Sequence, residues 1–326
     1  MVRDLRGLRF AVAVVALSVA ALVGCNKNQS LALVGGRRVE ASALDGNPLA
    51  LLPKGPLILY RLDAARLFAS SFGRNVAALT ATLLPIGPES NFVPARDVQR
   101  ITGAVYAMQG ADFCAVLQGN FDVARIRAAA AARAQTPGGA PLVRTEYAGN
   151  EIFTVANLGF VLLTPRAILS GNETGMRRAL DRLRFGRVDH ELPAWMHIIL
   201  NDERAAFGVV SDMSGQPAVA AAQGELPFVA GLRYVRVLGN FEPPGSNIVG
   251  TLTYGDGDAA VQGAEQLRNV ARLNYVLGVF SAFGFGGRPP ELTVALAGRD
   301  VGFATSLDGS MVGFLIDMAS QLTRSL

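Results

Sequence analysis

The chain has 326 residues, of which 50% are hydrophobic and 17% are charged, and its formal net charge is +4. A chain of this length and composition can bury one large core or two moderate ones, which excludes an intrinsically disordered tail. Almost all of its basic residues are arginines, and no basic cluster is interleaved with aromatic residues. We therefore expect no nucleic acid partner.

Residues 1–24 have the order of a secretory signal peptide. Arg3, Arg6 and Arg9 make the start of the chain positive, and an apolar stretch follows over residues 10–23. This stretch is shorter than the roughly 20 residues that a membrane-spanning helix needs. The residues after it are small and polar, so the sequence predicts a cleaved signal rather than a membrane anchor helix.

The signal ends in Leu22, Val23, Gly24 and Cys25. These four residues resemble the lipobox of bacterial lipoproteins, and the resemblance covers only the first 25 residues or so. It implies cleavage before Cys25, lipidation of its sulfur and acylation of its new amino group. Several acyl chains on one residue give stable attachment to membrane lipid. Asn26 stands where many inner-membrane lipoproteins of Gram-negative bacteria have Asp, which by the same resemblance implies the outer membrane, facing the periplasm or the cell surface.

Residues 25–56 are predicted to form the lipidated N-terminus and a flexible tether. Glycine and proline recur through them at short intervals, and their apolar pieces are short and irregular. We expect the folded body to begin near Leu57, with the strand "LILYRL" and then an alanine-rich helix after Asp63.

Two segments of the body resemble each other, one starting at Arg100 and the other at Gly231. Each reads as strand, turn, strand and then a Gly-x-x-Asp step into a helix. In the second segment Leu252 and Tyr254 share one parity and Thr253 has the other, which is typical of a half-buried strand. The helices have apolar residues at spacings that mark one buried face: Val123, Ile126 and Ala130 in the first, and Val261, Ala264, Leu267 and Ala271 in the second.

The similarity continues downstream, where hairpin turns are predicted at 148–150 and 297–299, each followed later by an apolar-faced helix. We interpret the body as two related halves, 57–188 and 189–326. The expected fold class is α+β, each half a mostly antiparallel sheet with helices packed on one face. Chance similarity between two ordinary α and β stretches is the alternative.

The comparison of the two segments bears on the "GDGD" motif at 255–258. A calcium loop needs oxygen ligands at alternate positions, and the three apolar residues that follow Asp258 cannot supply them. Only the last aspartate recurs in the first segment, as Asp122. We therefore interpret Asp122 and Asp258 as helix caps, and we predict no metal site and no cofactor.

No catalytic residue is predicted. The chain lacks a nucleophile elbow, a zinc-binding histidine pair and a phosphate-binding glycine loop. His197, in a segment that reads as a loop entering a strand, and Asp202 are the candidates for an acid–base pair, although ordinary surface roles suit both. Cys114, the only other cysteine, lies among apolar neighbours and is expected to be a small buried hydrophobe rather than a reactive thiol.

Two further features leave alternatives open. The apolar stretch at 275–285 is either core or a docking surface for lipid or protein. The arginines of the helix that begins near Met176 form either a solvated face or a contact with anionic lipid headgroups: Arg177, Arg178, Arg182 and Arg184.

The sequence therefore predicts a membrane-anchored envelope lipoprotein that acts as a non-catalytic binding or structural module, with an envelope protein or a lipid as its ligand. The alternative is a periplasmic hydrolase whose site is assembled from scattered residues.

Overall fold

The structure is a computed structural model, and its first unit comprises residues 39–68 and 76–193. The second unit comprises residues 69–75 and 194–309. The described residues are 39–77, 86, 88–107, 112–133, 135, 140–188, 192–216, 226–243, 245–272 and 292–309. The predicted boundary between the halves, 188/189, falls close to the observed one, but the short segment 69–75 belongs to the second unit. Phe72 explains this assignment, because its ring packs edge-on against Phe241 at 5.4 Å.

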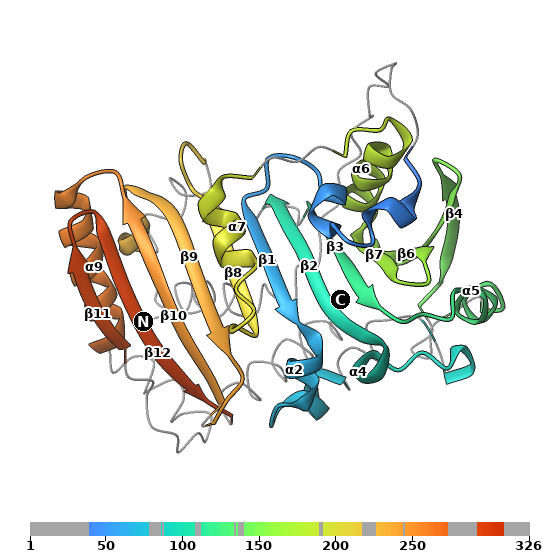
Figure 1. The fold of residues 1–326 in the computed structure, drawn as a ribbon, viewed down its shortest axis with the longest axis horizontal. Coiled ribbons are helices and arrows are strands. Elements are labelled where there is room, and N and C mark those ends of the chain that lie inside the picture. The colour runs from blue at the N-terminus through green and yellow to red at the C-terminus, as the bar shows by residue number, and fades with distance from the viewer. Residues whose placement is uncertain are drawn as a thin grey trace, which may run out of the picture. The chain divides into compact units, whose positions relative to one another are not determined.

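The first unit is built on an antiparallel sheet with the strand order β1-β2-β3-β7-β6-β5-β4 (Figure 1). Its strands are β1 (Ile58–Asp63), β2 (Val98–Ala107), β3 (Asp112–Gly119), β4 (Val143–Tyr147), β5 (Asn150–Val155), β6 (Leu158–Thr164) and β7 (Ala167–Asn172). Ala148 and Gly149 join β4 to β5 with φ of 52° and 74°. Two consecutive positive φ angles match the twist of a tight hairpin, which explains the predicted turn.

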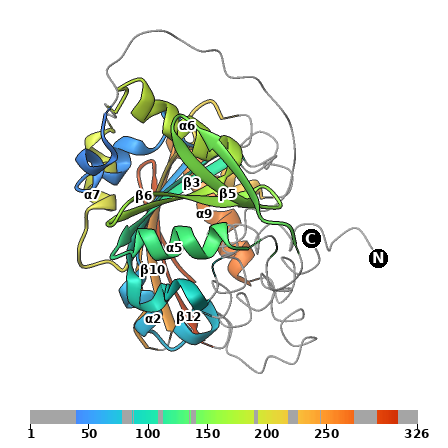
Figure 2. The same ribbon diagram turned by 90° about the vertical axis from the view of Figure 1, so that its right-hand side faces the viewer.

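Helices lie on both faces of this sheet. Ala115 and Leu117 of β3 pack in one cluster with Ile126 of α5 (Val123–Ala131). Cys114 of β3 points to the opposite face of the sheet, as does its cross-strand partner Ala104 in β2. Tyr106 lies on this same face, and its ring packs under Arg178 of α6 (Glu173–Arg184). Figure 2 accordingly shows α6 and α5 on opposite sides of the strands. The α+β class is confirmed, and the structure differs from the prediction in covering two faces rather than one.

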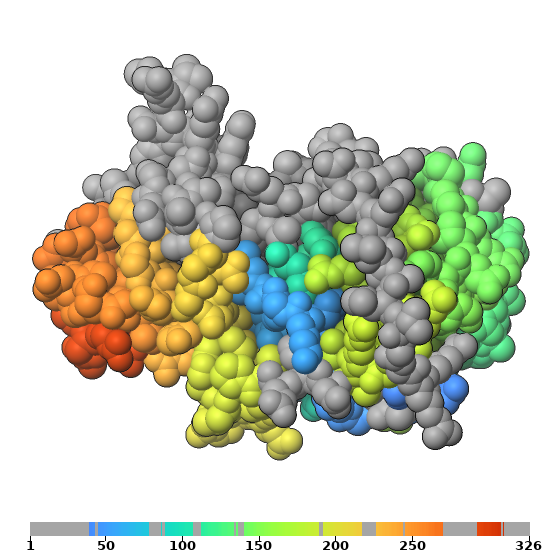
Figure 3. All heavy atoms as spheres, turned by 90° about the horizontal axis from the view of Figure 1, so that it is seen from above, coloured from blue at the N-terminus to red at the C-terminus, as the bar shows by residue number. Residues whose placement is uncertain are grey.

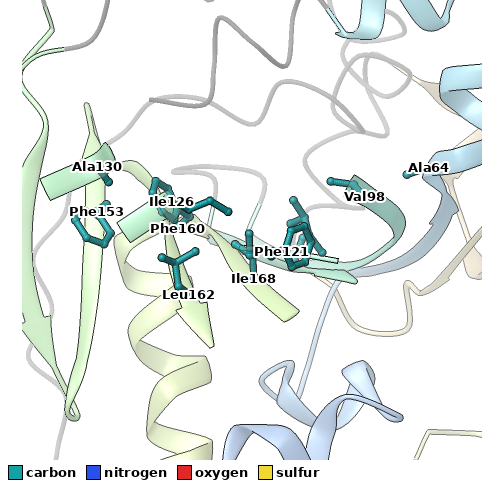
Figure 4. Packing of buried hydrophobic residues seen from close by; sticks show 11 residues of the cluster. Ala64, Val98, Phe121, Ile126, Ala130, Phe153, Phe160, Leu162 and Ile168 are labelled. Atoms are coloured by element: carbon teal, nitrogen blue, oxygen red, sulfur yellow. The ribbon is translucent and has the colours of Figure 1, made fainter. Parts of the chain in front are cut away.

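The core on the α5 side consists of closely packed aromatic and branched residues (Figure 4). Phe153 of β5 stacks on Phe160 of β6 at 5.2 Å, and both side chains are fully buried. Short elements close the unit: α2 (Ala64–Ala69), α4 (Pro94–Asp97) and the 3₁₀ turns η1 (Ala41–Leu44), η2 (Pro48–Leu51) and η3 (Pro88–Ser90). The predicted strand before Asp63 and helix after it are confirmed as β1 and α2.

The second unit is built on an antiparallel sheet with the order β8-β9-β10-β12-β11. Its elements are α7 (Ala194–Leu200), β8 (Phe207–Asp212), η4 (Pro227–Val229), β9 (Leu232–Asn240), β10 (Gly245–Tyr254), α9 (Gly257–Arg272), β11 (Leu292–Ala297) and β12 (Asp300–Asp308). Leu252 and Tyr254 are buried under α9 with Ala260 and Ala264, as the alternation of the strand predicted. Of the predicted buried face, Ala264 is fully buried and Leu267 packs against this core, whereas Val261 is 43% exposed and Ala260 is buried in its place.

The two units share one strand order, which confirms the related halves. In each unit, three successive strands lie side by side, and the last strand of the unit pairs with the third: β7 with β3, and β12 with β10. The first unit has an additional hairpin, β4–β5, beyond β6. The turn at 297–299 therefore corresponds to the β6–β7 turn, and its predicted equivalence with the turn at 148–150 is wrong.

The predicted tether is too long, because packed residues precede Leu57. Leu51 and Leu52 are 1% and 0% exposed. Side chains of the sheet and of α6 also hold residues 45–53 through hydrogen bonds: Arg182 Nε donates to Ala50 O at 2.9 Å, Tyr106 Oη to Pro53 O at 2.8 Å, Gln118 Nε2 to Asp45 O at 2.8 Å and Thr164 Oγ1 to Asp45 Oδ1 at 2.8 Å. Buried leucines and satisfied carbonyls mark a packed segment, despite its glycines and prolines.

Candidate functional site

The residues of the predicted lipobox, Leu22, Val23, Gly24 and Cys25, lie outside the described residues, and so do residues 275–285 and the last predicted helix. In the part of the chain that is described, no helix is both long and apolar enough to cross a membrane.

The two predicted helix caps have different outcomes. The Asp122 carboxylate accepts the Arg125 N–H at 3.0 Å and caps α5, as predicted. At the start of α9 the capping carboxylate is Asp256, whose Oδ1 accepts the Ala259 N–H at 2.8 Å. Asp258 lies inside the first turn of that helix, where its charge still opposes the helix dipole, so its assignment as the cap is wrong by two residues. Within the described ranges, no group of His, Cys, Asp and Glu could hold a metal ion.

The residues of the alternative acid–base pair lie in α7 and in the turn that follows it. His197 is an exposed residue of α7, so its segment is a helix and not the predicted loop. The Asp202 carboxylate accepts hydrogen bonds from the backbone N–H and the guanidinium of Arg204, with a 2.7 Å contact between Oδ2 and Nη2. This contact raises the pKa of Arg204. The Asp202 carboxylate thus stabilises a local turn through Arg204, which is the ordinary structural role that the sequence analysis gave as the alternative to acid–base chemistry.

Cys114 is fully buried in β3. Burial, together with the nearby Asp112 carboxylate, raises the pKa of its thiol to about 12. The thiolate is the reactive form of cysteine, so this side chain is inert at neutral pH, as the sequence indicated.

The arginines of α6 divide into two groups. Arg182 is buried and bonded to Ala50 O, while Arg177 and Arg178 form ion pairs with Glu173 and Asp112. Arg184 is exposed and lies over the ring of Phe185. Three of these four arginines therefore make contacts within the protein, and the two alternatives, a solvated face or a contact with lipid headgroups, stay open for Arg184.

One face of the second sheet carries partly exposed side chains and is the candidate binding surface. We define the open face as four cross-strand rows of β9, β10 and β12, set by their register: Tyr234–Thr253–Asp300, Arg236–Thr251–Gly302, Leu238–Val249–Ala304 and Asn240–Asn247–Ser306. These side chains point away from the core under α9, and α7 reaches only their margin, where Trp195 packs against Tyr234 at 5.3 Å (Figure 1).

Hydrogen bonds fix the two polar ends of the open face. At one end, Arg236 Nη2 donates to Thr253 Oγ1 at 2.8 Å and to Asp300 Oδ1 at 3.2 Å. At the other end, Ser306 Oγ donates to Asn247 Oδ1 at 2.6 Å, and Asn247 Nδ2 donates to Asn240 Oδ1 at 3.3 Å. The polar groups are thus held in fixed orientations on a sheet, which suits recognition of a partner.

An apolar row lies between these polar ends. Val249, in its centre, is 53% exposed, and in the neighbouring row of Arg236 and Thr251 a Cβ on Gly302 would meet no atom closer than 3.9 Å. The surface therefore offers a partly exposed apolar strip with fixed donors and acceptors on both sides, which is the usual composition of a binding surface. The strand parity of β10 was readable from the sequence, but the assembly of these rows was not, because it depends on the register of three strands.

Comparisons with known proteins support the fold. No family model matches the chain, and no curated protein matches its sequence. Among solved structures, "Structure of crystal form IV of TP0453" is similar with a TM-score of 0.51 and 10% identity over 83% of this chain and 96% of that one. "Structure of crystal form III of TP0453" has a TM-score of 0.50 and 11% identity, over 83% and 97%. At such identities the similarity shows a shared fold alone.

Proposed function

We propose that this protein is a bacterial envelope lipoprotein, anchored through lipid on Cys25, whose body acts as a non-catalytic binding module. The observation that carries the proposal is the sequence "LVGC" at the end of a signal-like segment with three arginines and an apolar stretch. The anchor places the protein in the envelope, and the resemblance to lipoproteins with Asn after the cysteine favours the outer membrane.

The open face supports the binding role. Its fixed polar groups and its exposed apolar row match the mixed character of surfaces that recognise other macromolecules or lipids. An envelope protein is the partner that suits it better than a single lipid, because the rows lie on an extended sheet with charged and amide groups at separate ends.

Metabolic labelling with palmitate tests the anchor. The wild-type protein is expected to incorporate label and to sediment with membranes, whereas Cys25→Ser is expected to lose both. Cys114→Ser is the matched control, since the buried Cys114 thiol should not carry lipid. Equal labelling of wild type and Cys25→Ser would refute the anchor.

Photo-crosslinking in cells tests the binding surface. A photoreactive residue at position 249 is expected to give a discrete adduct with an envelope protein. The same residue at position 261, on α9, is the control, because Val261 has a similar exposure and lies outside the open face. Identical adduct patterns from both positions would contradict a role for the open face.

A further inference from the structure

The C-terminal end of α6 has a fixed geometry. The Gly186 N–H bonds to Leu183 O at 3.3 Å, and the Arg187 N–H bonds to Arg182 O at 2.9 Å. Gly186 has φ of 65°. This pattern of two reversed hydrogen bonds and a left-handed glycine is a Schellman motif, which ends a helix and orients the residues around it.

The motif displays two arginines around one aromatic ring. The Arg184 and Arg187 guanidinium carbons lie 5.2 Å and 5.7 Å from the centre of the Phe185 ring, and both arginines are exposed. Within the described ranges neither of them forms an ion pair, in contrast to Arg177 and Arg178. Among the described residues, no carboxylate therefore competes with an outside anion for these two charges.

The first described residue of the chain contacts the same end of α6. Val39, the first described residue, donates its N–H to Leu183 O at 2.9 Å. Figure 3 shows the blue atoms of the first described residues beside yellow-green atoms of the α6 region. About 14 residues lead from Cys25 to Val39, so even a fully extended chain would keep this end of α6 within about 50 Å of the anchor.

We propose that Arg184, Phe185 and Arg187 form the surface by which the anchored body contacts the headgroups of anionic membrane lipids. The inference rests on the proposed lipid anchor, which brings this surface to the bilayer. Guanidinium groups bind phosphate oxygens in a bidentate manner, and an aromatic ring with basic neighbours suits the boundary between headgroups and acyl chains. Each arginine strengthens the contact by about fivefold at an anionic surface, so the pair contributes about 25-fold. A gain of this size is enough to hold a tethered body on the membrane surface, because the tether keeps its effective concentration at the membrane high.

Covalent footprinting on vesicles tests the contact without changing the site. The mature chain from Cys25 onward is coupled through its Cys25 thiol to a maleimide lipid, and the buried Cys114 stays unmodified. Phenylglyoxal then labels arginines on vesicles of phosphatidylcholine with or without phosphatidylglycerol. We expect labelling of Arg184 and Arg187 to slow severalfold only on the anionic vesicles, while Arg204, with a side chain 91% exposed, reacts equally on both. Equal rates at Arg184 on both kinds of vesicle would overturn the proposal.

A fluorescent variant tests the contribution of the charges. In a Trp195→Phe, Phe185→Trp background, brominated anionic lipids are expected to quench the tryptophan. Arg184→Gln with Arg187→Gln should abolish the quenching, whereas Arg144→Gln with Arg204→Gln, which removes the same charge elsewhere, should leave it unchanged. Thermal unfolding checks that each variant folds. Equal loss of quenching in both double variants would show a general charge effect and refute the assignment.

Because the coupling is chemical, this result is independent of whether cells lipidate Cys25. A failure of the proposed anchor would appear in palmitate labelling, and a failure of the contact surface would appear here.

Discussion

Leu52 offers the sharpest test that the segment before β1 is part of the folded body. Its side chain is 0% exposed, whereas a residue in a flexible tether would contribute almost nothing to stability. Truncation of a fully buried leucine removes its hydrophobic burial and leaves a cavity, which costs about 3 to 5 kcal/mol. We therefore expect Leu52→Ala to lower the free energy of unfolding of the first unit by about 3 kcal/mol.

Urea denaturation measures this loss. With a slope of roughly 2 kcal/mol per molar, the midpoint of the first unit should fall by about 1.5 M. Circular dichroism would follow the transition, and hydrogen exchange of amides in β2 and β3 would assign it to the first unit. Ile198→Ala is the control, because Ile198 is 70% exposed and its truncation should change stability by less than about 0.5 kcal/mol. A Leu52→Ala variant as stable as this control would refute the packing of residues 39–56 and restore the long tether.

Three further predictions concern single side chains. In a Cys25→Ser background, a thiol reagent at pH 8 should find no reactive cysteine until the protein is unfolded, because burial and Asp112 raise the pKa of Cys114 to about 12; rapid reaction of the native protein would contradict this. The pKa of Asp97 is lowered, because hydrogen bonds from Arg96 and the Val93 N–H outweigh the opposing effect of burial. Its folded-state pKa is then below the unfolded one, so the stability it contributes is present above about pH 4 and is lost as the pH falls further. Asp97→Asn should accordingly cost about 1 to 3 kcal/mol at pH 7 and progressively less as the pH falls below about 4, and a cost in urea titrations that stays constant as the pH falls would argue against the assignment. Asp256→Ala should destabilise α9 by about 1 kcal/mol and Asp258→Ala by only a few tenths, since Asp256 makes the capping hydrogen bond; thermal unfolding that ranks the two in the opposite order would overturn this.

Local patterns in the sequence predicted most of the elements that the structure describes. The alternation through Leu252 and Tyr254 and the helical spacing of Met176 and Leu180 were correct, because burial of one face determines both periodicities. The repeat was also recognisable, because the step from a strand into a capped helix recurs at Asp122 and near Asp258. Exact caps were less certain, since two aspartates in "GDGD" compete for one helix start.

Features that depend on distant residues were not predictable. Residues 45–53 look like a linker, and only the donors from Tyr106, Gln118 and Arg182 show that they are packed. The additional β4–β5 hairpin hid the true counterpart of the turn at 297–299, because both turns contain Ala-Gly. The open face and the Schellman motif of α6 required the strand register and the backbone path, which a single sequence does not determine.

The central claim, that Cys25 carries the lipid that anchors this body, is tested most directly by the intact mass of the protein purified from its native membrane. We predict a chain that begins at Cys25 and carries the added mass of several acyl chains. A chain of unmodified mass, whether cleaved elsewhere or still bearing residues 1–24, would contradict the anchor.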